Sequence, residues 1–393
     1  MSPPAPAVRT EASTLRTARA AIVAWFGESQ RDLPWRRTRD PYAVWVSEIM
    51  LQQTQVSTVA PRYARWMTRF PSVQALAAAP LDDVLAEWAG LGYYARARNL
   101  HAGARLCAAE HGGRVPRSVD EIGRLPGVGR YTAGAIASIA FDLPAPIVDG
   151  NVERVLARLF GVRGDVRAQP ARGRLWQLAG LLVDPGEDGA RPSQINQGMM
   201  ELGALLCTPR RPRCDDCPVA PLCQARRDGD PESLPHKPPA QRVSELSQVA
   251  LALWRGGKIL LVRRPAEGLW GGLYELPSGE PTVGESLVGA ARRIAAERVG
   301  LALDAAAIAP LPPPAACFRQ LLSHRRVTFH GFRAVAPAGA VRRTFYDAHR
   351  WIAPEAARAL GVSRATDRII ALLANPATLE PPRRRKPIGQ EVT

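Results

Sequence analysis

The chain has 393 residues, enough for two domains that each bury a core, and no long charge-free apolar run that would indicate a membrane span. It carries 52 Lys and Arg against 36 Asp and Glu, giving a formal net charge of +16 and an isoelectric point near 10.5. This charge favours a polyanionic partner, although a genome rich in arginine would also produce it.

The N-terminal residues 1–14, MSPPAPAVRTEAST, are rich in proline and alanine and lack the apolar core of a secretion signal. We expect them to be disordered. The six cysteines cluster unevenly, which argues against a disulfide scaffold and for a reducing compartment. The sequence therefore predicts a cytoplasmic protein.

Residues 15–229 follow a helical pattern. Asp40 before Pro41 predicts a helix N-cap with proline at the first helical position. Apolar and amide side chains then recur at helical spacing, at Tyr42, Trp45, Val46, Ile49, Gln53 and Val56. Glycine and proline separate the later runs at short intervals. These patterns predict an all-α domain over 15–229.

The stretch LPGVGRYTAGAI, residues 125–136, predicts two helices joined by a glycine turn. Gly127 and Gly129 can adopt positive φ, and a helix beginning near Arg130 directs its positive dipole end to the same place. We therefore expect the backbone of Gly127, Val128 and Gly129 to hold a DNA phosphate. A glycine that only ends a helix would give a similar local pattern.

Two carboxylates have contrasting sequence environments. Asp149, in PIVDGNVERV, precedes a helical run and is a natural N-cap, so backbone donors should keep it ionised. Glu48, in VWVSEIMLQQT, has apolar neighbours that should raise its pKa and keep it protonated. Carboxylates shifted in opposite directions suit hydrolysis of a glycosidic bond. The alternatives are that Asp149 only caps a helix and that Glu48 is an ordinary helix residue.

Cys207, Cys214, Cys217 and Cys223 have the spacing C-x6-C-x2-C-x5-C. Four thiolates in this space suit an iron–sulfur cluster or zinc. The spacing resembles the 4Fe–4S loop of the endonuclease III and MutY DNA glycosylases. We expect one 4Fe–4S cluster that is structural and that orders nearby basic side chains at DNA, namely Arg210, Arg211 and Arg213. The isolated Cys107 and Cys317 are not expected to bind it.

Beyond the cysteines the pattern changes. Residues 230–246 are proline-rich and polar, which predicts a linker. Within 247–375, two strand-like runs meet at Gly256–Gly257, and a helical run, SLVGAARRIAAERVGL, and a strand-like run, RRVTFHGFRAVA, follow. This part predicts an α+β domain. Residues 376–393 form a basic tail.

Five segments together resemble the MutY family of adenine DNA glycosylases: WVSEIMLQQTQV, GLGYYARARNL, LPGVGRYTAGAI, VDGNVERVLAR and the cysteine loop. The resemblance implies removal of adenine mispaired with 8-oxoguanine or guanine. By it, Glu48 protonates adenine, Asp149 stabilises the cationic sugar, and Tyr131 and Asn151 assist. Substrate contacts are implied for two sets: Arg31, Trp35, Arg36 and Gln197 at the adenine, and Gln53, Thr54, Leu91 and Tyr93 at the 8-oxoguanine.

The stretch GLWGGLYELPSGE and the helix after it resemble a Nudix-like domain. Nudix hydrolases hold magnesium with several glutamates on that helix, whereas RRIAAERVGL retains only Glu297. Metal-dependent hydrolysis is therefore not expected. In LLSHRRVTFH, Ser323 and His324 match the family's 8-oxoguanine-reading motif, and Leu322 replaces its aromatic residue.

Three alternatives compete with this interpretation. The first is an endonuclease III-type glycosylase with lyase activity, which Tyr131 disfavours because it stands where that branch has a reactive lysine. The second is a DNA-binding redox sensor without catalysis, and the third is a nucleotide-pool Nudix hydrolase. We expect a bacterial, nucleoid-associated monomer whose partner is double-stranded DNA with an A:8-oxoguanine or A:G mispair.

Overall fold

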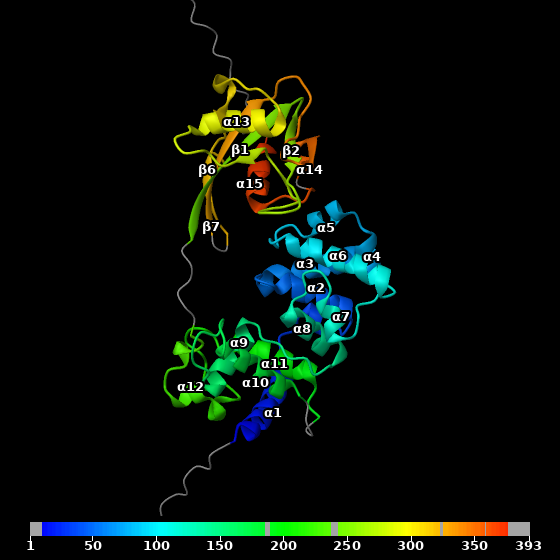
Figure 1. The fold of residues 1–393 in the computed structure, drawn as a ribbon, viewed down its shortest axis with the longest axis vertical. Coiled ribbons are helices and arrows are strands. Elements are labelled where there is room, and N and C mark those ends of the chain that lie inside the picture. Colours follow the sequence, from blue (N-terminus) through cyan, green and yellow to red (C-terminus); the bar gives the residue numbers. More distant parts are fainter. Residues whose placement is uncertain (1–9, 185–188, 237–242, 323–324, 358, 376–393) are drawn as a thin grey trace, which may run out of the picture. The chain divides into compact units, whose positions relative to one another are not determined.

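The computed structural model describes residues 10–184, 189–236, 243–322, 325–357 and 359–375. Two compact units make up the chain (Figure 1). The first comprises Met1–Ala78 and Asn99–Pro239, and the second comprises Ala79–Arg98 and Ala240–Thr393. The short segment Ala79–Arg98 therefore packs with the C-terminal unit, although the helical pattern of the sequence runs through it.

All the regular elements among the described residues of the first unit are helices. Its principal helices, with α6 shared across the boundary of the units, are α1 (Glu11–Ser29), α2 (Pro41–Leu51), α3 (Val56–Arg69), α4 (Val73–Ala78), α6 (Ala95–Glu110), α7 (Val119–Gly123), α8 (Arg130–Phe141), α9 (Gly150–Phe160), α10 (Ala171–Val183), α11 (Pro192–Leu205) and α12 (Gln224–Arg227). Short 3-10 turns η1 (Pro34–Arg36), η2 (Ala220–Leu222) and η3 (Pro231–Ser233) connect them. The predicted all-α domain is confirmed as a helical fold.

Helix α2 is the central buried helix of this unit. Its N-cap Asp40 accepts hydrogen bonds from the backbone of Tyr42 and Ala43, and Pro41 opens the helix, as predicted. Every residue from Tyr42 to Met50 is buried. The helix ends at Leu51, so the predicted helical period through Gln53 and Val56 is wrong there. Gln53 instead adopts φ 54°, in a turn before α3.

Helix α11 contacts several of the other helices of the first unit. It packs against α1, α8 and α9, while α2 packs against α8. These contacts bring the buried face of α2, the start of α8 and the start of α9 around one face of α11. Side chains that are far apart in sequence therefore meet in one place.

The second unit contains an eight-stranded mixed sheet. Its path is β3–β2–β1–β7–β5, and β4, β6 and β8 pair with β1, β7 and β2. The strands are β1 (Ser244–Arg255), β2 (Lys258–Arg263), β3 (Tyr274–Glu275), β4 (Ser278–Gly279), β5 (Ala309–Pro310), β6 (Cys317–Leu322), β7 (Arg325–Val335) and β8 (Ala348–Ile352). The long β1–β7 pair is parallel, and the other pairs are antiparallel.

Helices cover both faces of this sheet. Val249 and Leu251 of β1 pack with Ile294 of α13 (Leu287–Val299), while Ala250 of β1 packs into the core that contains Ile369 of α15 (Arg364–Leu373). This explains the continuous apolar run of β1, because a strand buried on both faces has no polar side. The short helix α14 (Pro354–Ala357) lies on the α15 side.

The secondary-structure predictions for this unit are confirmed. Strands β1 and β2 form the predicted antiparallel pair, and Gly256 and Gly257 both adopt positive φ at the turn between them. The predicted helix is α13 and the predicted strand is β7. Strand β1 begins at Ser244, three residues before the expected start of this domain. The mixed sheet with covering helices is the α+β fold that the pattern predicted.

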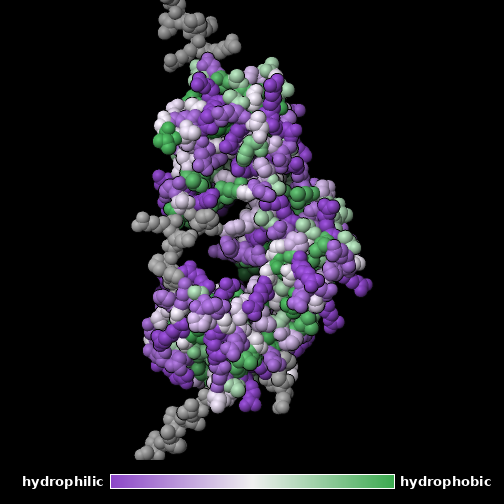
Figure 2. All heavy atoms as spheres, viewed as in Figure 1, coloured by the Kyte–Doolittle hydropathy of each residue, from purple (hydrophilic) through white to green (hydrophobic). Residues whose placement is uncertain are grey.

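Apolar side chains are gathered mainly in the interior. The face seen in Figure 2 is mostly hydrophilic, with apolar residues scattered among polar ones. Among the described residues, no helix combines the length and the hydrophobicity needed to cross a bilayer.

Candidate active site

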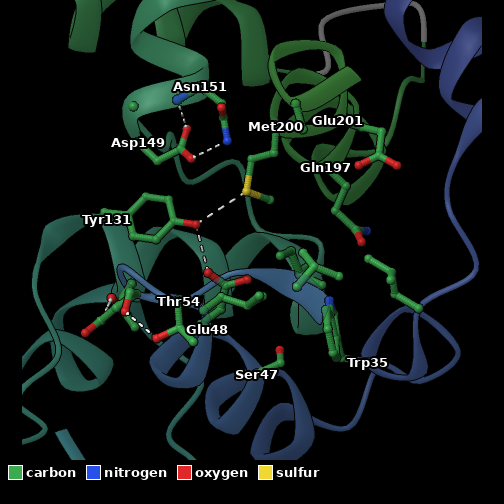
Figure 3. Close-up of a pocket in the computed structure, with 18 of the residues that line it drawn as sticks. Trp35, Ser47, Glu48, Thr54, Tyr131, Asp149, Asn151, Gln197, Met200 and Glu201 are labelled. Carbon is green, nitrogen blue, oxygen red and sulfur yellow. Dashed lines mark hydrogen bonds between the residues drawn. The ribbon is translucent and has the colours of Figure 1, made fainter. Parts of the chain in front are cut away.

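A pocket of about 740 Å³ opens in the first unit. Its walls come from the segment around η1, the last turns of α2 and the loop after it, the starts of α8 and α9, and the middle of α11. The sequence-predicted residues that line it are Arg31, Trp35, Arg36, Glu48, Gln53, Thr54, Gly129, Tyr131, Asp149, Asn151 and Gln197. Figure 3 shows most of these side chains around the cavity.

Glu48 lies on the buried helix α2 and is only 5% exposed. Its Oε2 accepts a hydrogen bond from the hydroxyl of Tyr131 at 2.8 Å. Burial is the largest influence on this carboxyl and raises its pKa from an ordinary 4.5 to about 7, with Asp149 adding to the rise and Tyr131 and Arg36 opposing it. The expectation of a raised pKa is confirmed, and Glu48 can exchange a proton near neutrality.

Tyr131 follows the glycine turn and occupies the first turn of α8. Its hydroxyl points into the cavity between Glu48 and Asp149, and it also lies 3.3 Å from Sδ of Met200 (Figure 3). Burial, followed by the neighbouring carboxylates, raises its pKa well above 10. Tyr131 therefore remains a neutral hydrogen-bond donor at the pH where Glu48 titrates.

Asp149 caps α9, as predicted. Its Oδ1 accepts hydrogen bonds from the backbone N–H of Asn151 and Val152 at 3.0 and 2.7 Å, and its Oδ2 accepts from Nδ2 of Asn151 at 3.2 Å. Burial nevertheless raises its pKa, and the capping donors only partly oppose this rise. The expectation that Glu48 and Asp149 shift in opposite directions is therefore wrong, because both carboxyls lose contact with water.

Arg154 fixes the side chain of Asn151 by a hydrogen bond. The Nη2 of Arg154 donates to Oδ1 of Asn151 at 2.9 Å, and its Nε donates to the backbone carbonyl of Cys207 at 2.6 Å. A second bond from Nη2 reaches the carbonyl of Gly203. One buried guanidinium thus connects the cap of Asp149 with the first cysteine of the cysteine loop.

Sequence reasoning missed Glu201, which is fully buried in α11 and lines the pocket. It receives hydrogen bonds from both Arg31 and Arg36. Burial alone would raise the pKa of Glu201, but these arginine hydrogen bonds outweigh it and lower that pKa to about 2. The available signal was its position four residues after Gln197, on the same helix face.

Four other predicted pocket residues differ in their local contacts. Trp35 is buried and packs edge-on against Tyr63, with ring centroids 5.4 Å apart. Gln53 and Thr54 form the turn after α2, where the positive φ of Gln53 is unusual for a residue with a side chain. The amide of Gln197 donates to the backbone of Ser193. All four side chains lie at the cavity wall.

The glycine turn has the predicted helix on its C-terminal side. Gly127 adopts φ 75°, and a Cβ there would meet the side chain of Asn99 at 2.7 Å. The expectation of positive φ at Gly129 is wrong, because Gly129 has φ −89° and ψ 175° as the N-cap of α8. No side chain caps that helix end. The backbone N–H groups at the start of α8 are therefore available to an anion.

Leu91 and Tyr93 do not line this pocket. Leu91 is 5% exposed, whereas Tyr93 is 48% exposed and adopts φ 46°. Both lie in the segment that packs with the second unit. Ser323 and His324 lie outside the described residues.

The four predicted cysteine ligands line one small cavity of the first unit, beside Arg158 and apolar side chains. All four are free of disulfides. Arg158 donates to the backbone carbonyls of Thr208 and Pro209 at 2.7 and 3.0 Å, which holds the loop in place. Four thiols converging on one apolar cavity fit the ligand set of an iron–sulfur cluster. In the described part of the chain, no His, Cys, Asp and Glu side chains are grouped closely enough to hold a single metal ion.

The predicted basic side chains Arg210, Arg211 and Arg213 are exposed on the cysteine loop. Arg213 forms an ion pair with Asp216, and this carboxylate offsets the positive charge of Arg213. Arg211 adopts φ 48° and donates its backbone N–H to Glu232. The loop therefore exposes the side chains of Arg210 and Arg211.

In the second unit, the helix that would carry magnesium ligands has other side chains. Ile294 is fully buried in the core, and Arg298 donates to the backbone carbonyl of Ser278 at 2.7 Å. Both side chains pack beside Gly279, where an added Cβ would lie within 3.1–3.3 Å of them. Glu297 forms an ion pair with Arg293. The described side chains of this helix do not form a metal site.

Three family models match the chain. Residues 46–180 match the HhH-GPD superfamily of base excision DNA repair proteins, and residues 249–372 match the NUDIX domain. Residues 207–223 match the iron–sulfur binding domain of endonuclease III. The last match indicates that the four cysteines bind an iron–sulfur cluster, so zinc is set aside.

Curated relatives align over about two thirds of the chain. The adenine DNA glycosylase of Homo sapiens is 42% identical over 314 residues, which cover 66% of this chain and 57% of the human protein. That of Buchnera aphidicola subsp. Schizaphis graminum is 34% identical over 258 residues, 65% of this chain and 73% of the relative. The chain spans 57–60% of the human, rat and mouse relatives.

Among solved structures, a thermostable thymine-DNA glycosylase matches the chain with a TM-score of 0.50 and 32% identity. The match covers 55% of this chain and 97% of that protein.

Proposed function

The chain belongs to the adenine DNA glycosylase family, and from this premise we propose that it hydrolyses the N-glycosidic bond of adenine mispaired with 8-oxoguanine or guanine in double-stranded DNA. The observation that carries the proposal is the buried pair of Glu48 and Tyr131, which faces Asp149 across one cavity (Figure 3). Two carboxyl groups around a cavity are the groups that glycoside hydrolysis requires.

Glu48 supplies the proton in this proposal. An acid with a pKa of about 7 is half protonated near neutrality and loses its proton readily, which is the favourable range for a general acid. The hydroxyl of Tyr131 fixes the orientation of the carboxyl. Protonation of the departing adenine weakens its bond to the sugar.

Asp149 faces the sugar. Its carboxylate, fixed by Asn151 and Val152, stabilises the positive charge that develops as adenine leaves. Water, or Asp149 followed by water, then attacks the sugar carbon. Tyr131 has no amine and forms no Schiff base with the sugar, so the product is an abasic site in an unbroken strand.

The size of the pocket supports an extruded base as the substrate. A glycosylase acts on a base that has left the helical stack, and the unstacking costs on the order of a few kcal/mol. The cavity of about 740 Å³ can hold a purine and part of its sugar. Trp35, Gln197 and the two arginines of its wall would contact the adenine.

Binding of the duplex rests on two parts of the first unit. The start of α8 would hold one phosphate through backbone N–H groups, and the cysteine loop would present Arg210 and Arg211 to others. We propose a 4Fe–4S form for the cluster, held by Cys207, Cys214, Cys217 and Cys223. It would fix the loop without taking part in bond cleavage.

The second unit would read the opposite base. Ser323 and His324, which follow Leu322 in the sequence, are the proposed 8-oxoguanine contacts, and Tyr93 and Gln53 would wedge beside that base. We propose that the two domains are joined by a linker that ends before Ser244, and that the protein acts as a monomer on the chromosomal DNA of a bacterial cell.

The test is a single-turnover assay on a duplex with one adenine opposite 8-oxoguanine, with guanine and thymine as alternative partners. We expect release of adenine in the order 8-oxoguanine, guanine, thymine, and strand breakage only after hot alkali. Strand breakage without alkali, with a borohydride-trapped adduct, would instead identify a lyase. Equal release opposite thymine would contradict the mispair specificity.

A further inference from the structure

Glu201 is a fully buried acid for which the proposed reaction has no step. Its Oε1 accepts from the backbone N of Arg31, from Nε of Arg31 and from Nη1 of Arg36 at 2.9, 2.8 and 3.0 Å. Its Oε2 accepts from Nη2 of Arg31 and Nη2 of Arg36 at 2.6 and 2.8 Å. One carboxylate therefore engages two guanidinium groups, and five hydrogen bonds satisfy it.

These bonds fix one wall of the pocket. Arg31 and Arg36 border the segment that contains Leu33 and Trp35, and Nη1 of Arg36 also donates to the carbonyl of Arg31 at 3.2 Å. The guanidinium of Arg36 lies over the ring of Phe26, 5.4 Å from its centroid. The segment is thus tied to α11 by Glu201.

The same bonds control the charge near Glu48. Among the described residues, three titratable or charged groups from elements around α2 influence the pKa of Glu48: Tyr131 of α8, Asp149 at the cap of α9, and Arg36 of η1. Arg36 is the cation of this set, and its charge favours loss of the proton from Glu48. Glu201 faces Arg36 and Arg31, and it remains ionised because they lower its pKa to about 2.

We propose that Glu201 is a positioning residue of the active site, which holds the Arg31–Arg36 wall in place and offsets the charge of Arg36 so that Glu48 keeps its proton. The proposal rests on the glycosylase function proposed above. Without the negative charge of Glu201, the positive charge of Arg36 would lower the pKa of Glu48 further, so Glu48 would lose its proton at a lower pH. Glu48 would then already have lost its proton at neutral pH and could not act as the acid.

The test compares pH profiles of single-turnover adenine release in wild type, Glu201→Gln and Arg36→Gln. We expect the high-pH limb of Glu201→Gln to move down by about one pH unit, with much of the rate recovered in acid. Arg36→Gln should move the limb upward, because the cation that favours ionised Glu48 is gone. The double variant should return the limb close to the wild-type position.

Arg31→Gln is the matched control. It removes the other guanidinium that Glu201 holds, but Arg31 is not among the groups that set the pKa of Glu48. Its rate can fall through loss of the wall, whereas its limb should stay in place. A merely structural Glu201 would give lower rates and lower stability in all three single variants with unmoved limbs, and that outcome overturns the proposal.

Carbon-13 NMR titration of the Glu48 carboxyl in the free protein supplies a readout that needs no turnover. We expect the midpoint of the Glu48 titration to be lowest in Glu201→Gln and highest in Arg36→Gln. An identical midpoint in these two variants would overturn the proposal. If Glu201→Gln does not fold, Arg36→Gln and the double variant still give the comparison, and equal midpoints in these two overturn it. Absence of adenine release by the wild type would contradict the proposed function alone.

Discussion

Acidic side chains in two regions of this protein have different partners. In the pocket of the first unit, Glu48 and Asp149 are bonded to neutral donors: a tyrosine hydroxyl, backbone N–H groups and an amide. Around α13 of the second unit, the acids are bonded to arginine. These pairs are Glu275 with Arg264 at 2.9 Å, Glu285 with Arg293 at 2.8 Å and Glu297 with Arg293 at 3.5 Å.

The difference decides which acids can exchange protons. Neutral partners and burial bring the pKa of Glu48 to about 7, whereas the hydrogen bond from Arg293 lowers the pKa of Glu285 to about 2. The bond from Arg293 thus keeps Glu285 charged at physiological pH. Glu275 is an exception, because burial raises its pKa although Arg264 opposes the rise. Glu201 resembles Glu285 inside the pocket itself, because its two arginines keep it ionised.

The largest expected effect is on catalysis by Glu48. Glu48→Gln should slow adenine release on the order of 10³-fold, because a general acid typically contributes 10²–10⁴-fold. Binding of the duplex should persist, since the amide oxygen of glutamine still accepts from Tyr131. Single-turnover rates and gel-shift titrations measure both. Glu297→Gln, at the exposed acid of α13, is the control and should leave the rate unchanged; near-normal turnover of Glu48→Gln would remove it from the acid role.

Two substitutions of Asp149 can separate the role of its charge from its role as a helix cap. Asp149→Asn and Asp149→Ala should both slow adenine release by about 10²-fold or more, because each removes the anion that faces the sugar. Asparagine still caps α9, whereas alanine should lower the free energy of unfolding by about 1 kcal/mol. Rates and urea unfolding of both variants provide the measurement. An asparagine variant with a wild-type rate would show that the charge is dispensable.

Burial of Glu48 also predicts a pH dependence of stability. The folded protein binds this proton with a pKa of about 7 and the unfolded chain with an ordinary 4.5, so stability is full below the lower value and falls as pH rises to the higher one. The loss amounts to about 3 kcal/mol. Relative to wild type, Glu48→Gln should therefore gain about 3 kcal/mol of unfolding free energy between about pH 4.5 and pH 8.

Urea unfolding at the two pH values measures this gain, and Glu297→Gln serves as the exposed control with little expected change. A gain that is equal at both pH values would mean that the proton of Glu48 is not the cause.

The smallest expected effect is in the second unit. Ile294 and Arg298 occupy the space beside Gly279, and Glu285 and Glu297 are both paired with Arg293. Added magnesium and nucleoside triphosphates should therefore yield no phosphate or pyrophosphate above background. A colorimetric phosphate assay with pyrophosphatase tests this expectation. Magnesium-dependent release that Glu297→Gln abolishes would contradict it and would remove the contrast between the two regions.

Features that depend on near neighbours could be predicted from the sequence. The caps at Asp40 and Asp149 bond to N–H groups two and three residues away, and the Gly256–Gly257 turn joins adjacent strands. The raised pKa of Glu48 followed from its apolar helix. The spacing of the four cysteines indicated their shared ligand, because a short loop must bring them together.

Only the tertiary structure decided how distant groups affect one another. The bond between Tyr131 and Glu48 joins residues 83 positions apart, and the bonds of Glu201 to Arg31 and Arg36 join residues 170 and 165 positions apart. The depth of Asp149 also depends on helices far from it in sequence, which is why its pKa rises despite its cap. Local chemistry selects caps and turns, but packing between helices sets burial and charge pairing, and these determine which acid holds a proton.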